Sequence, residues 1–147
     1  MMSVQAMPWI LGIHAISTIM MGGLIWFVQI VHYPLMSRVG DIGFAQYEQS
    51  HTKRTGWVVA PLMLTELTTA LLIFTQADNL GFTLPFAGLV CLGLIWASTA
   101  LLQVPAHRTL EQGFDDRVHT RLVRTNWIRT VLWTARSVIS IMLLVKL

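Results

Sequence analysis

Four long apolar runs constrain this chain more than any other feature. They cover residues 9–31, 57–74, 84–104 and 127–147. A helix needs roughly 20 apolar residues to cross the hydrocarbon core of a bilayer, and each run has about that length. Only 12% of the residues are charged, which is well below the share in ordinary soluble domains. We therefore expect an all-α integral membrane four-helix bundle, a single domain over residues 1–147 without an internal repeat.

The basic residues predict how this bundle is oriented. The two long connections, residues 32–56 and 105–126, are rich in lysine and arginine, whereas residues 1–8 and 75–83 contain neither. By the positive-inside rule, the long connections face the cytoplasm and both termini face outward across the inner membrane. Asp41, and either Asp115 or Asp116, are suited to cap helices in these connections. We therefore expect two of the spans to extend beyond the cytoplasmic face.

The same distribution of charge limits the partners of the chain. The formal net charge of +3 comes from residues confined to two connections and one helix, so no nucleic-acid surface is expected. The expected partners are the lipid bilayer and a small-molecule substrate. Glycines at 22, 23, 88 and 93 permit close helix contact within or between chains, which leaves a homo-oligomer open. The lone Cys91 provides neither a disulfide nor a thiolate zinc site within one chain.

Glu66 and Arg136 place opposite charges inside two of the spans. Each lies nine residues beyond a tryptophan at the cytoplasmic interface, Trp57 or Trp127. Nine helical residues cover roughly 14 Å, so both side chains are expected near the middle of the bilayer. An ion pair between them follows, because a charge in the membrane needs a partner. Such a pair has either a structural role in fixing helix register or a role in function.

The fourth span carries nearly all its polar side chains on one face. At 100° per residue, this face contains Asn126, Arg129, Thr130, Trp133, Arg136, Ser137 and Ser140. We expect the face to point into the bundle. Arg129 has no acidic partner at its depth, so it either binds an anionic or carbonyl-bearing molecule or reaches back to the lipid headgroups.

Histidines gather on the predicted cytoplasmic side. His32, His51 and His107, with Glu48 in an E-x-x-H spacing to His51, form a plausible metal site. The alternative is a set of hydrogen-bonded interfacial histidines on solvated helix surfaces. For haem, His32 with His107 or His14 alone are the candidate ligands, with Trp133 and Asn126 as neighbours. Glu66 is too far from His51 along one helix to share a metal ion with it.

The stretches Trp26–Met36 (WFVQIVHYPLM) and Thr125–Arg136 (TNWIRTVLWTAR) resemble small four-span membrane proteins. The nearest are the anthrone-oxygenase-like family and, more remotely, HemJ-type protoporphyrinogen oxidases and CopD-like proteins. The matching features are His14, Tyr33 with Pro34, Pro61, and Asn126 with Trp127 and Arg129. The third span lacks the lysine of the HemJ pattern. The resemblance implies a small redox-type membrane enzyme that acts on a flat, partly apolar substrate, with haem as a candidate cofactor.

These patterns lead to one functional expectation with two alternatives. We expect a membrane-embedded oxidoreductase or oxygenase with a polar cavity on the cytoplasmic side, dependent on haem, on a non-haem metal ion or on neither. Glu66, Arg129, Arg136 and His32 are the candidate catalytic residues. His32, His51 and His107 would serve in metal ligation or proton transfer. The alternatives are a small transporter or binding subunit with a polar path through the bundle, and a structural membrane subunit.

Overall fold

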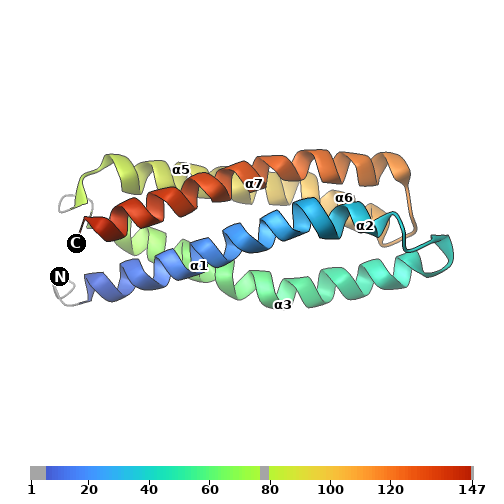
Figure 1. Ribbon diagram of the computed structural model, residues 1–147, viewed down its shortest axis with the longest axis horizontal. Helices are drawn as coiled ribbons and strands as arrows, with labels where there is room; N and C mark the ends of the chain where they lie inside the picture. The colour runs from blue at the N-terminus through green and yellow to red at the C-terminus, as the bar shows by residue number, and fades with distance from the viewer. Residues whose placement is uncertain (1–5, 77–79, 147) are drawn as a thin grey trace.

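The computed structural model describes residues 6–76 and 80–146, which form four helical rods side by side (Figure 1). The first rod joins α1 (Met7–Phe27), the π-helical turn η1 (Val28–His32) and α2 (Tyr33–Met36). The second rod is α3 (Asp41–Phe74). The third joins α5 (Thr83–Ser98), the π-helical turn η2 (Thr99–Gln103) and α6 (Val104–Leu110), and the fourth is α7 (Asp116–Val145). The expected all-α four-helix bundle is confirmed.

The two ends of the bundle differ. The start of α1, the end of α3, the start of α5 and the end of α7 lie at one end, which we name the terminal end (Figure 1). The α2–α3 and α6–α7 connections lie at the other, which we name the loop end. With 34 residues, α3 is about 51 Å long and exceeds the roughly 30 Å of hydrocarbon in a bilayer. The expected extension of two rods past their spans is therefore confirmed. The last residue of the fourth predicted span, Leu147, lies outside the described residues.

Only one of the two predicted N-caps is formed. The Asp115 carboxylate accepts hydrogen bonds from the backbone N–H groups of Arg117 at 2.9 Å and Val118 at 3.0 Å, and so caps α7. The prediction that Asp41 caps α3 is wrong. Gly40 occupies that position with φ +83°, a conformation that favours glycine, and Asp41 is the first helical residue. Asp41 instead places a negative charge at the positive end of the helix dipole.

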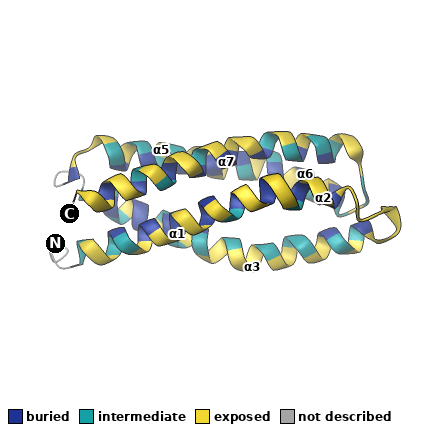
Figure 2. Ribbon diagram, viewed as in Figure 1, coloured by how far each residue is buried: buried dark blue, intermediate teal, exposed yellow. Residues whose placement is uncertain are grey.

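The outer surface of the bundle is suited to lipid. Four rods are long and apolar enough to cross a membrane, and large apolar side chains are exposed around them (Figure 2). Trp9, Trp57 and Val145 are among the most exposed, at 76%, 77% and 80%. An apolar surface this extensive is unfavourable in water. The protein is therefore a membrane protein.

The chain contains an internal repeat, so the expectation of none is wrong. Gly23–Trp26 (GLIW) recurs as Gly93–Trp96 with identical residues. The Gly43–Phe44 pair recurs at the same spacing, and so does Arg54–Trp57 (RTGW), as RTNW. Each half of the chain also has the same order of elements, an α-helix, a π-helical turn, a short α-helix and a long α-helix. The bundle is therefore two copies of one helical hairpin.

A π-helical turn recurs in each half of the chain, although η2 begins one residue later than the spacing of Gly23 and Gly93 would place it. Each ends two residues before a proline, Pro34 or Pro105. Proline lacks an N–H group and its ring crowds the preceding turn, so a widened turn relieves the clash without breaking the rod. Equivalent positions also share burial: Glu66 with Arg136, and Met63 with Trp133, are all buried. The repeat therefore extends through both helices of the hairpin.

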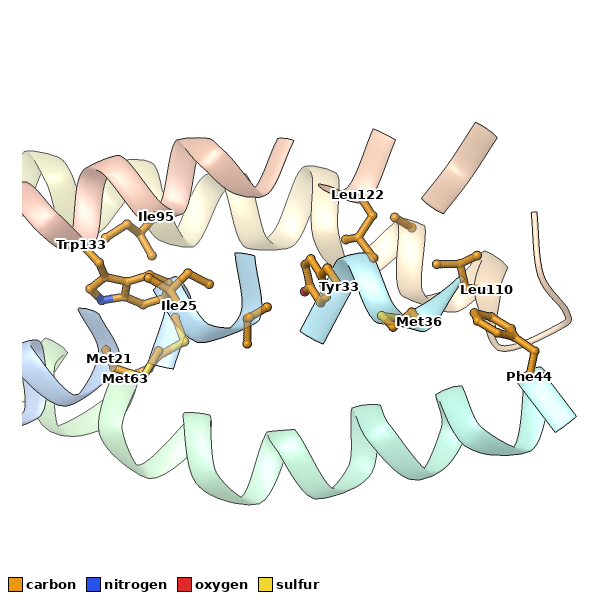
Figure 3. Close-up of a cluster of buried hydrophobic side chains, with 12 residues drawn as sticks. Met21, Ile25, Tyr33, Met36, Phe44, Met63, Ile95, Leu110, Leu122 and Trp133 are labelled. Atoms are coloured by element: carbon orange, nitrogen blue, oxygen red, sulfur yellow. The ribbon is translucent and has the colours of Figure 1, made fainter. Parts of the chain in front are cut away.

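The buried apolar side chains leave a space near the loop end. Figure 3 shows the buried apolar side chains in sequence along the bundle, from Trp133, Ile25 and Met21 past Tyr33 to Met36, Leu110 and Phe44 near the loop end. A cavity lies beside Met21, Ile25, Tyr33 and Trp133. A separate cluster of Leu11, Ile73, Leu80 and Leu143 fills the bundle at the terminal end. The core is therefore closely packed at the terminal end and interrupted toward the loop end.

Candidate functional site

A cavity of about 320 Å³ lies within the bundle toward the loop end. Its volume is within the range of about 300–1,000 Å³ that small-molecule sites have. All four rods contribute to its wall, which is apolar at depth and polar toward the loop end. The deep wall consists of Met21, Ile25 and Trp133. The polar side chains on the wall are Tyr33, His51, Thr52, Thr55, Thr99, Gln103, His107, Arg108, Glu111 and Arg129.

Four side chains form a continuous hydrogen-bonded series beside this cavity, which we name the relay: Arg129, Tyr33, His107 and Glu48. Arg129 Nη2 lies 3.4 Å from the Tyr33 hydroxyl, to which it donates. The Tyr33 hydroxyl lies 2.9 Å from His107 Nε2, and His107 Nδ1 bonds to the carboxylate of Glu48. With Nδ1 of His107 assigned as the donor to Glu48, Nε2 is free to accept the proton of Tyr33. The relay therefore connects the cavity wall to a buried carboxylate.

The relay is shielded from solvent. Tyr33 is 3% exposed and Glu48 is fully buried, and the second carboxylate oxygen of Glu48 has no hydrogen-bond partner. Through its hydrogen bond to His107, Glu48 therefore forms the buried end of the relay.

Arg129 is held toward the cavity and does not reach the headgroups. Its Nε and Nη2 donate to Asn126 Oδ1 at 2.9 and 2.6 Å, and Nη1 lies 3.4 Å from Thr99 Oγ1. Asn126 in turn donates to Gln29 Oε1 at 2.9 Å. With only 9% of its surface exposed, the guanidinium has few routes to lipid. The alternative in which Arg129 reaches the headgroups is therefore wrong.

The predicted ion pair of Glu66 and Arg136 is confirmed. The two side chains lie 3.6 Å apart at Oε1 and Nη2 and are almost completely buried. The Trp133 indole donates to Glu66 Oε2 at 3.0 Å, and Arg136 Nη1 donates to the carbonyl oxygen of Gly88. Trp133 therefore connects the deep wall of the cavity to this pair, while Glu66 and Arg136 themselves stay outside the cavity wall.

The predicted inward face of α7 is likewise confirmed. Its polar residues are buried at Asn126, Arg129, Thr130, Arg136 and Ser140, and Ser137 is half-buried. A close approach of α1 supports this arrangement, because a Cβ atom on Gly22 would lie 2.8 Å from Ser137 Oγ. Helical periodicity was sufficient to predict this inward face because α7 is an uninterrupted helix.

The structure brings the predicted histidine layer together. His32 Nε2 and His51 Nδ1 are 2.9 Å apart, the rings of His51 and His107 are 5.6 Å apart at their centroids, and His107 bonds to Glu48. His51 and His107 line the cavity, whereas His32 lies behind them. Within residues 6–76 and 80–146, no group of three or more His, Cys, Asp or Glu side chains is arranged to hold a metal ion. The metal site stays a prediction that would require these rings to turn.

The residues present do not fit haem with the expected ligands. His107 uses both ring nitrogens within the relay, and His32 does not line the cavity. His14 lies toward the terminal end, where its Nδ1 is 2.8 Å from Thr69 Oγ1. It borders a second cavity of about 10 Å³, which has room for about one water molecule. None of the three imidazoles therefore presents a free nitrogen to a space of the required size.

Two side chains of the candidate site were not predicted as site residues. Tyr33 stands out in the sequence only through its position before Pro34, yet its hydroxyl lies at the centre of the relay. Thr99 follows an apolar helix and carries no motif, but it borders the cavity and accepts from Arg129. The nearest signal in the sequence was a proline, which directly follows Tyr33 and lies six residues after Thr99.

Comparisons of the chain with protein-family models, with curated proteins and with solved structures each found no match. The resemblance to anthrone-oxygenase-like proteins therefore stays a prediction.

Proposed function

We propose that the protein is a membrane-embedded enzyme that removes a proton from a carbonyl- or phenol-bearing, partly apolar substrate as the first step of its oxidation. The observation that supports this function most strongly is the relay on the wall of a cavity with an apolar deep end. A cation, a phenol, an imidazole and a carboxylate in series are the groups that a proton-abstracting site requires.

The proton moves in one direction along the relay. The substrate gives a proton to the Tyr33 oxygen as Tyr33 passes its own proton to His107 Nε2 and His107 passes its Nδ1 proton to Glu48. The products of this step are a substrate anion and a neutral Glu48. Arg129 stabilises the anion, because its guanidinium lies against Tyr33 and keeps its charge in the cavity wall. The anion is the electron-rich form from which dioxygen takes electrons.

The cavity supports an enzyme rather than a transport path. Its deep wall of Met21, Ile25 and Trp133 is closed by buried apolar side chains. Beyond this wall the cluster of Leu11, Ile73, Leu80 and Leu143 fills the terminal end. A solute entering from the loop end would therefore meet a packed core.

Anthrone, a flat three-ring ketone with an acidic CH₂ group, tests the proposal directly. The oxidation consumes one dioxygen and gives one anthraquinone and one water. The purified protein in lipid nanodiscs should speed dioxygen uptake and anthraquinone formation together. Tyr33→Phe removes the hydroxyl and should lower this rate by about 10²–10⁴-fold, and Glu48→Gln should also lower it.

Two variants separate a loss of chemistry from a loss of structure. Thr109→Ala changes an exposed hydroxyl that bonds only to the backbone of Pro105, and it should keep the wild-type rate. A folded Tyr33→Phe variant that oxidises anthrone as fast as the wild type would rule out the relay as the source of activity.

In the cell, we propose that the loop end faces the cytoplasm and that both termini face outward across the inner membrane. The lysines and arginines of the two long connections lie at or near the loop end, which supports this orientation. The relay would then operate close to the cytoplasmic interface.

A further inference from the structure

We infer that the cavity takes up its substrate sideways from the bilayer, through an opening between α3 and α6. The substrate is accordingly a lipid-dissolved, mostly apolar molecule with one hydrogen-bonding end. This inference rests on the proposed function only in treating the cavity as the substrate site.

The exposed residues of the cavity wall locate the opening. Among all the residues that line the cavity, only Gly56, Val104 and Arg108 are exposed. Gly56 belongs to α3, and the other two belong to α6. The rest of the wall is buried or half-buried. The opening therefore lies on the side of the bundle, where α3 faces α6.

Hydrogen bonds between α3 and Glu111 close the loop end of the cavity. Thr52 Oγ1 donates to the Glu111 carboxylate at 2.8 Å, and Gln49 Nε2 lies 3.3 Å from the Glu111 carbonyl oxygen. These bonds join α3 to the end of α6 above the opening. A molecule arriving from the water beyond the loop end would have to break them, whereas one arriving from the side would not.

The internal repeat explains why the opening exists on only one side. The face that α3 turns toward η2 is equivalent, under the repeat, to the contact of α7 with η1. At the α7 contact, Asn126 Nδ2 donates to Gln29 Oε1 and closes the space between the helices. The equivalent residues at the α3 contact are Gly56 and Thr99, and both border the cavity. One of two related interfaces therefore has two amide side chains that meet, and the other has a threonine and a glycine that leave it open.

The depth of the opening determines the class of molecule that enters. Gly56 directly precedes the exposed Trp57, a residue type that favours the membrane interface. The Arg108 side chain at the rim is long enough to reach lipid phosphates while its stem stays apolar. A flat amphiphile at this depth would pass its apolar part toward Trp133 and keep its polar end beside Tyr33 and Arg129.

Placing at the opening the two residue types that close the equivalent α7–η1 contact, Asn126 and Gln29, tests the inference. Anthraquinone, a flat diketone that needs no turnover, serves as the probe in phosphatidylcholine nanodiscs, and its association is followed by quenching of tryptophan fluorescence. Gly56→Asn combined with Thr99→Gln should slow association by about ten- to a hundredfold. Gly43→Asn is the matched control, since Gly43 lies on α3, is exposed and has open space around it.

A second measurement avoids any dependence on folding of the double variant. In a Cys91→Ser background, Gly56→Cys is labelled with a bulky thiol reagent after the protein has folded in the nanodisc, and Gly43→Cys is labelled as the control. Labelling at position 56 should slow anthraquinone association, and labelling at position 43 should not. Wild-type association in the labelled Gly56→Cys protein would overturn the lateral route.

The outcomes for the two proposals are distinct. The relay proposal fails if Tyr33→Phe still oxidises anthrone at the wild-type rate, whatever the binding rates are. The lateral route fails if the closed or labelled proteins take up anthraquinone as fast as the wild type, whatever the turnover is.

Discussion

Glu66 and Arg136 illustrate how a buried charge can connect distant parts of this bundle. Each is less than 2% exposed, and Glu66 Oε1 and Arg136 Nη2 lack close hydrogen-bond partners in the 3.6 Å contact between them. The Trp133 indole bonds to Glu66 and also forms the deep wall of the cavity. The pair is therefore a support for the cavity, and its loss should affect stability before it affects proton transfer.

Removing one member of this pair should destabilise the protein strongly. Arg136→Met leaves the Glu66 carboxylate buried without a cation, and we expect a loss of about 3–5 kcal/mol in the free energy of unfolding. Combining Arg136→Met with Glu66→Gln should recover most of that loss, because no unpaired charge then remains. Denaturant titrations in detergent give the values. The exposed Arg124→Met is the control, and a single variant as stable as this control would contradict the account.

At the level of the helices, the contact between α1 and α7 depends on the absence of a side chain. A Cβ atom at Gly22 would come within 2.8 Å of Ser137 Oγ, whereas one at Gly23 would meet nothing within 4 Å. Gly22→Ala should therefore destabilise the protein by about 1–3 kcal/mol through overpacking. Gly23→Ala should have little effect. Thermal unfolding should also show that Ser137→Gly restores stability to Gly22→Ala, and a lack of rescue would refute the steric explanation.

The same helices show how far the sequence alone could lead. Hydrophobic length and helical period predicted four spans, the inward face of α7 and the pairing of Glu66 with Arg136. A polar cavity beside the histidines was also expected and is present, but much of its lining was not predicted, because the lining depends on the widened turns before Pro34 and Pro105 and on the small residues Gly56 and Thr99. The type of residue at one position does not show where a cavity lies, because a cavity depends on how the helices pack against one another.

The Asp41 cap and the internal repeat were misjudged for different reasons. Asp41 has the side chain of a cap, but Gly40 supplied the backbone conformation one residue earlier. The two copies of the repeat share few identical residues, since only Gly23–Trp26 and a few later positions match. The equivalence becomes plain once the order of elements and their burial are compared.

For the whole molecule, the distribution of charge predicts a single orientation. Alkaline phosphatase, which is active only outside the cytoplasm, should be active when fused to the C-terminus and inactive when fused within residues 111–115. A fluorescent protein that folds only in the cytoplasm should give the reverse result. The opposite pattern would place the relay at the outer interface and would contradict the positive-inside assignment.

The two hairpins also contribute different chemistry to the site. The first repeat supplies Tyr33 and both buried carboxylates, Glu48 and Glu66, and the second supplies His107 and both buried guanidinium groups, Arg129 and Arg136. All three hydrogen bonds of the relay therefore join one repeat to the other. The candidate site therefore depends on residues that differ between the two copies.

The contact between the equivalent positions 66 and 136 has a further consequence. In a symmetric homodimer of identical hairpins, a residue on the two-fold axis meets its own copy. Two glutamates or two arginines would then repel each other in a medium of low dielectric constant. Joining the hairpins in one polypeptide removes that symmetry constraint, so an acid and a base can occupy the axis together.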